Sequence, residues 1–128
     1  MRGVMRWLMA VVFVATPVMA WAHEGEEHEM MAAGEQELVG EVVDVTCYLG
    51  HGKSGLGAGH VDCAQKCIKN GLPVAIKVGD KLYLAVKADH TPANEMLVKY
   101  AGRQVEVHGT VLEGDGQRMI AISNVEAK

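Results

Sequence analysis

The alternation of hydrophobic and polar residues predicts a series of short strands from residue 38 onward. Residues 38–47 are rich in β-branched side chains and contain Gly40, a composition typical of a long, bent first strand. Four further strands are expected over residues 73–78, 81–87, 104–112 and 117–125. The second and third of the five strands are joined by Gly79-Asp80, which suits a two-residue hairpin turn.

Two helices are predicted between these strands. Asp62 can cap a short helix over residues 63–69, after the first strand. Thr91, followed by proline, begins a second helix whose apolar residues share one stripe. Residues 48–59 contain five glycines and are expected to form an ordered turn or a mobile loop. This order predicts a mainly β, five-stranded OB-fold-like barrel with a helix after strand 1 and another between strands 3 and 4.

The first 22 residues have the composition of a secretory signal peptide. Arg2 and Arg6 precede a short apolar run, and small residues follow as far as Ala22. The apolar run is shorter than the roughly 20 residues that span a bilayer as a helix. We therefore expect cleavage of residues 1–22 after Ala22, a periplasmic or secreted protein, and no membrane anchor after processing.

Residues 23–37 are expected to form a flexible acidic tail in front of an OB-fold-like domain at residues 38–128. The imidazole and thioether groups of this tail belong to His23, His28, Met30 and Met31. Such groups in one flexible segment would suit transient copper capture. The alternative is an acidic leader whose histidines have no role.

The net charge of the chain and the motifs it lacks argue against several classes of function. The chain has a formal net charge of −4 at pH 7, which disfavours binding to a phosphate backbone. Gly-Lys-Ser at residues 52–54 lacks the spacing of a phosphate-binding loop, and no Ser-His-Asp set can be argued. We therefore expect a protein that is not an enzyme and that binds no nucleic acid.

The chemistry of the chain is concentrated in its three cysteines. Cys63 and Cys67 are four residues apart, so on the predicted helix they share one face. His60 precedes this helix, and Cys47 can approach from the end of the first strand. Cys63 would be the first helical residue, where the helix dipole favours a thiolate. These four residues would form a Cys3His metal site, with His51 as a reserve ligand.

Residues 38–125 resemble the small exported bacterial OB-fold domains also described as tRNA-anti-like. The resemblance includes an insert after the first strand, which some of those domains carry. The matching motifs are Cys47-Tyr48, Gly50-His51 and the His-x-x-Cys-x-x-x-Cys run from His60 to Cys67. The functions of these domains are poorly defined, so the resemblance implies a fold and a site but no reaction.

Three functions fit the sequence. The first is a periplasmic metal-binding module, a carrier or sensor for one Cu(I) or Zn(II) ion, with a protein partner for metal transfer. The second is an OB-fold interaction domain that binds no metal, with a loop stapled by a disulfide from Cys47 to Cys63 or Cys67. The third is a small thiol–disulfide redox protein, although its usual Cys-x-x-Cys spacing is missing.

Overall fold

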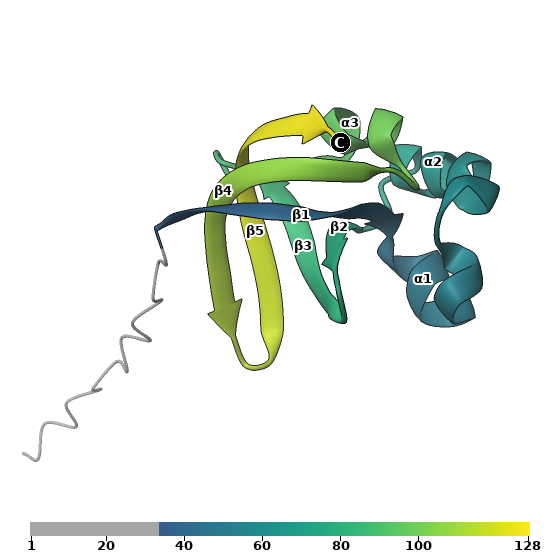
Figure 1. Ribbon diagram of the computed structural model, residues 1–128, viewed down its shortest axis with the longest axis horizontal. Coiled ribbons are helices and arrows are strands. Elements are labelled where there is room, and N and C mark those ends of the chain that lie inside the picture. The colour runs from purple at the N-terminus through teal and green to yellow at the C-terminus, as the bar shows by residue number, and fades with distance from the viewer. Residues whose placement is uncertain (1–33) are drawn as a thin grey trace, which may run out of the picture.

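The computed structural model describes residues 34–128, which form a closed five-stranded barrel (Figure 1). The strands are β1 (Glu35–Asp44), β2 (Val74–Val78), β3 (Lys81–Lys87), β4 (Gln104–Gly114) and β5 (Gln117–Ala127). Around the barrel they follow the order β1-β2-β3-β5-β4. The pairing of β3 with β5 is parallel and every other pairing between these strands is antiparallel.

The barrel closes because β1 is long enough to pair along both of its edges. Glu41 is in register with Lys77 of β2 and with Gln104 of β4. Gly40 permits this crossing, since a Cβ at that position would collide with the backbone carbonyl of Lys77. A glycine inside the strand therefore marks a close backbone approach, as its place in the sequence indicates.

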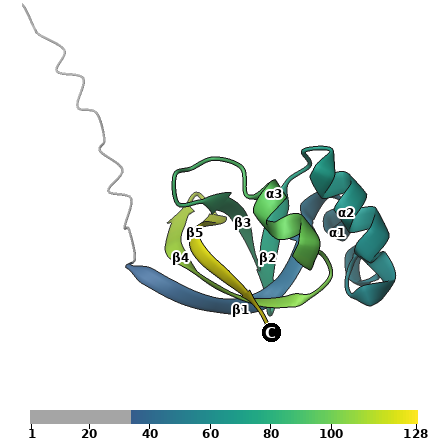
Figure 2. The ribbon, with the colours of Figure 1, turned by 90° about the horizontal axis from the view of Figure 1, so that it is seen from above.

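Helical segments lie at the end of the barrel where β1 finishes (Figures 1 and 2). They are α1 (Val45–His51), the 3-10 segments Gly52–Gly55 and Ala58–His60, α2 (Val61–Lys69), α3 (Asn94–Leu97) and the 3-10 turn Val98–Tyr100. Ile68 of α2 and Leu97 of α3 are fully buried in the same cluster as the inward side chains of the strands. These two helices therefore pack against the barrel core.

The predicted fold class is confirmed, and the differences are local. The first strand ends at Asp44 instead of residue 47, because α1 begins at Val45. Residues 48–59, expected as an ordered turn or a mobile loop, are ordered and largely helical or 3-10. The helix after them begins at Val61, so Asp62 lies inside its first turn and does not cap it. Likewise, Thr91 does not cap α3, whose first residue is Asn94.

The domain also extends beyond the predicted boundary at residue 38. Residues 35–37, placed in the tail from sequence, are the first residues of β1 and pair with β4. The predicted signal peptide and the tail side chains of His23, His28, Met30 and Met31 lie outside the described residues. Among residues 34–128, no helix combines the length and the hydropathy needed to cross a membrane.

Leu97→Ala should destabilise the protein by about 2–5 kcal/mol, because it removes a fully buried side chain and leaves a cavity in the core. Met96→Ala is the matched control, since Met96 is next to Leu97 in sequence and its side chain is only partly buried against that core. Equilibrium unfolding in urea would measure both changes. Equal losses of stability in the two variants would contradict the placement of α3.

Candidate metal centre

Asp44 determines where Cys47 lies. Its side chain is fully buried at the junction of β1 and α1. The two carboxylate oxygens accept hydrogen bonds from the backbone N–H groups of Thr46 (3.1 Å) and Cys47 (3.3 Å). This is helix N-capping by an aspartate, and it satisfies two amides that the first turn leaves without partners. Cys47 is therefore held in the first turn of α1 by a fixed backbone.

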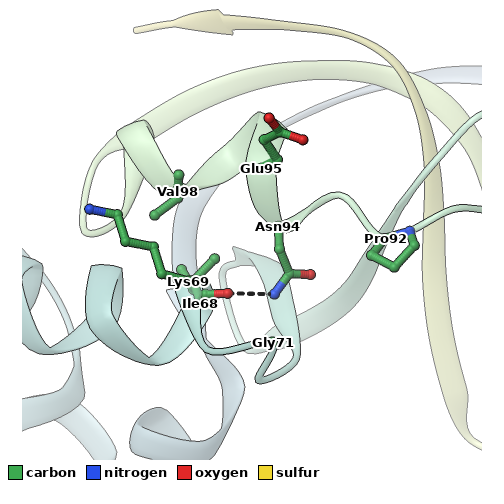
Figure 3. Close-up of a pocket in the computed structure, with 7 residues that line it drawn as sticks. All are labelled: Ile68, Lys69, Gly71, Pro92, Asn94, Glu95 and Val98. Carbon is green, nitrogen blue, oxygen red and sulfur yellow. Dashed lines mark hydrogen bonds between the residues drawn. The ribbon is translucent and has the colours of Figure 1, made fainter.

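A second anchored helix, α2, carries Cys63 and Cys67. Ala64 and Ile68 of this helix are buried in the barrel core. At its C-terminal end, the side-chain nitrogen of Asn94 donates to the carbonyl oxygens of Ile68 (2.9 Å) and Leu72 (2.7 Å). Figure 3 shows the Asn94 side chain pointing from α3 to the Ile68 carbonyl. Burial on one face and this clamp fix the orientation of the two cysteines.

The three cysteine sulfur atoms meet between these helices. The Sγ atom of Cys47 lies 3.8 Å from that of Cys63 and 3.9 Å from that of Cys67. All three sulfurs are within 4.8 Å of one another, and all three cysteines are free thiols. Sulfurs that bind one ion tetrahedrally at about 2.3 Å are separated by about 3.8 Å. The cluster therefore has the spacing of a three-sulfur metal site, and the three cysteines could hold an ion.

His60 lies beside the cluster, close to a different pair of side chains. One of its ring nitrogens is within 4.8 Å of ligand atoms of Cys47 and Asp44, a grouping that does not include Cys63 or Cys67. Its Nε2 atom is buried and has no hydrogen-bond partner among the described residues. A buried polar atom without a partner carries a desolvation cost, which a bound cation could relieve. The three-sulfur donor set therefore fits a soft or borderline ion, and His60 lies at its edge, beside Cys47.

The other predicted site positions differ from this arrangement. His51 is exposed at the last residue of α1 and belongs to none of the clusters of metal-ligating side chains in residues 34–128. Cys63 is the third residue of α2, not the first, because the helix begins at Val61. It is nevertheless in the first helical turn, and it is the exposed member of the three cysteines.

The surroundings favour the neutral thiol at two positions. The pKa of Cys47 is raised, first by the hydrogen bond of its thiol to the Asp44 carboxylate and then by burial. Burial is also the main cause that raises the pKa of Cys67. Both shifts describe the metal-free cluster. An incoming cation must displace protons from these sulfurs, as is general for thiolate ligands.

The glycines of the connection between α1 and α2 bring it close to its neighbours. A Cβ at Gly55 would lie 2.9 Å from the carbonyl oxygen of Cys47. Gly57 has a φ of +71° and donates its N–H to the Glu41 carboxylate at 2.5 Å. This part of the sequence was expected to be an ordered turn or a mobile loop, and it is ordered and tied to the barrel.

The sequence interpretation missed Asp44 as a residue of the site. An aspartate can cap a helix that begins directly after it, but the β-branched residues on both sides of Asp44 indicated a continuous strand. A second cluster, Glu37, Glu106 and His108, was also missed. There, Glu106 already has a cationic partner, because the Nζ atom of Lys128 bonds to it, and the Nε2 atom of His108 lies 3.4 Å from its carboxylate.

Two hollows on the surface of the described part of the chain are lined by residues other than the three cysteines. One lies between the end of α2 and α3 and is lined by residues such as Ile68, Asn94 and Val98 (Figure 3). Another lies beside α1, where Tyr48 and Leu49 face residues of β3 and the β4–β5 turn. Leu49 is 70% exposed at the edge of this second hollow.

Comparison of this chain with protein-family models, with curated proteins and with solved structures finds no significant match. The geometry of the barrel and of its cysteine cluster is therefore the basis for a functional assignment.

Asp44→Ala should lower the free energy of unfolding by about 1–2 kcal/mol, because two amides of α1 lose their acceptor. Asp44→Asn is the control of the same shape and should lose less stability, since asparagine is also a good N-cap but keeps only one of the two acceptor oxygens. Chemical denaturation of the metal-free protein would compare them. Equal stability of wild type and Asp44→Ala would show that the cap does not hold α1.

Proposed function

We propose that this protein is an exported, non-catalytic metal-binding barrel that holds one Cu(I) or Zn(II) ion at its cysteine cluster. The convergence of three free sulfur atoms at separations of 3.8 and 3.9 Å is the observation that carries this proposal. Two separate helices place those sulfurs, and hydrophobic packing alone gives no reason for them to meet. Soft thiolates select Cu(I) and Zn(II) over hard cations.

Cys47, Cys63 and Cys67 are the proposed ligands, and His60 completes a Cys3His set. The support for His60 is its buried Nε2 without a hydrogen-bond partner in the described chain, together with its position beside Cys47. A three-sulfur set alone suits Cu(I), whereas the fourth ligand suits the tetrahedral preference of Zn(II). The effect of His60 on each ion therefore tests which of the two the site prefers.

The exposure of Cys63 supports a role in carrying or sensing the ion. A site closed on all sides suits a structural ion, whereas an exposed ligand gives a partner protein access for ligand exchange. The signal-peptide pattern of residues 1–22 supports action in the periplasm or outside the cell. We further propose that His23, His28, Met30 and Met31 assist capture of copper, because their side chains suit that ion.

An interaction domain without a metal is the second candidate. The hollow at α1 favours it, because its lining groups the exposed Leu49 with the apolar residues Val45, Tyr48, Leu82 and Leu84. That function would not require the three thiols to meet. Binding measurements with the cysteine variants therefore separate the two candidates.

The metal-free mature protein, kept reduced, should bind one equivalent of Zn(II) or Cu(I) when it is titrated against a competing chelator. Cys47→Ser, Cys63→Ser or Cys67→Ser should each weaken binding by at least about 100-fold, since loss of even an outer-sphere partner costs 10- to 100-fold. His60→Ala should weaken Zn(II) binding by about tenfold or more, and His51→Ala is its matched control.

Native mass spectrometry reports the number of bound ions, and chelator competition reports the affinity. Unchanged affinity and stoichiometry in Cys63→Ser would overturn the proposed site. Equal effects of His60→Ala and His51→Ala would remove His60 from the ligand set and leave a three-sulfur site.

A further inference from the structure

We propose that the same cysteine cluster exchanges thiols with an external disulfide, with Cys63 as the first sulfur to react and Cys47 as the resolving sulfur. This activity goes beyond metal binding and needs no bound ion. Its partner is identified by chemistry, as a disulfide carried by a small molecule or by a thiol–disulfide exchange protein.

The position of Cys47 supports its resolving role. Its Sγ atom is the shared neighbour of both other sulfurs, at 3.8 Å from Cys63 and 3.9 Å from Cys67. A disulfide bond is about 2.05 Å long, so the sulfurs of Cys47 and Cys63 must approach each other by roughly 2 Å to form one. Rotation of a cysteine side chain about its Cα–Cβ bond moves the sulfur by a distance of this order.

Differences in exposure set the order of the reaction. Cys63 is exposed, whereas Cys47 and Cys67 are partly buried. A bulky external disulfide therefore meets Cys63 first, because access is one of the factors that control thiol–disulfide exchange. Cys63 and Cys67 lack the usual two-residue spacing of a redox pair, and the sequence left Cys47 open to pairing with either of them. The partner sulfur comes instead from a different helix.

The reaction balances in two steps. The Cys63 sulfur, as thiolate, attacks the external disulfide, forms a mixed disulfide and expels one external thiolate. The Cys47 sulfur then attacks the sulfur of Cys63, forms the internal disulfide and expels the second external thiolate. Two cysteine thiols are oxidised, one external disulfide is reduced, and the two protons lost by the cysteines go to the two departing thiolates.

Cys67 remains as a thiol after this reaction. It lies beside Cys47, so it can attack that sulfur, transfer the bond to a Cys47–Cys67 disulfide and free Cys63 again. Both internal products contain Cys47. Either one removes two sulfurs from the proposed metal ligands, so oxidation and metal retention exclude each other if the proposed function also holds.

The test uses the reduced, metal-free mature protein and oxidised glutathione as the external disulfide. Samples are quenched with acid, alkylated and mapped by peptide mass spectrometry. Wild type should give one internal disulfide that contains Cys47, with a single alkylated cysteine. Cys67→Ser should give the Cys47–Cys63 bond at a similar rate. Cys47→Ser should accumulate the glutathione adduct on Cys63, because its resolving sulfur is missing.

Cys63→Ser should react at least about tenfold more slowly than Cys67→Ser, since the exposed sulfur is gone. Circular dichroism of each variant checks that the barrel is folded, and a misfolded serine variant is replaced by the alanine variant. A Cys63–Cys67 bond as the main wild-type product would overturn the proposal. So would a Cys63 adduct that lasts as long in wild type as in Cys47→Ser. Because no metal is added, loss of metal binding and loss of exchange are separate results.

Discussion

The arrangement of the site depends on one buried carboxylate, that of Asp44. It ends β1 and begins α1 at the same residue, because its oxygens replace the acceptors that the first amides of a helix lack. Burying a carboxylate is costly unless hydrogen bonds compensate it, and here two backbone amides do so. Without this cap, β1 could continue in extended form and would carry Cys47 away from α2.

The barrel was predictable from sequence because its signals are local and agree with one another. Alternating residues, hairpin glycines and the order of the elements all indicate the same topology. The start of α1 was not predictable in the same way. Valines and a threonine around Asp44 have high β propensity, and the cap, together with packing against Gly55, outweighs that preference. Propensity is a weak guide where a single buried polar group determines the local conformation.

The candidate site was predictable only where its geometry follows from local sequence spacing. The four-residue spacing of Cys63 and Cys67 survives any small shift of the helix boundary, so their common face follows from periodicity alone. The approach of Cys47 depends on tertiary structure, and it comes from a helix rather than from the end of a strand. The position of His60 beside Cys47 and Asp44 requires the path of the whole connection, which spacing does not contain.

The two proposed activities compete for the same atoms, and the position of Cys47 explains why. Its sulfur is adjacent to both others, and the hydrogen bond to Asp44 raises the pKa of its thiol. A cation stabilises the thiolates by neutralising charge, whereas a disulfide removes that charge by forming a bond. Cys63, the exposed sulfur, is the one that a partner can reach in either case. One exposed thiol next to two partly buried thiols therefore suits both proposed activities. A partner protein could exchange the metal ion through Cys63, and an external disulfide could react with the same sulfur.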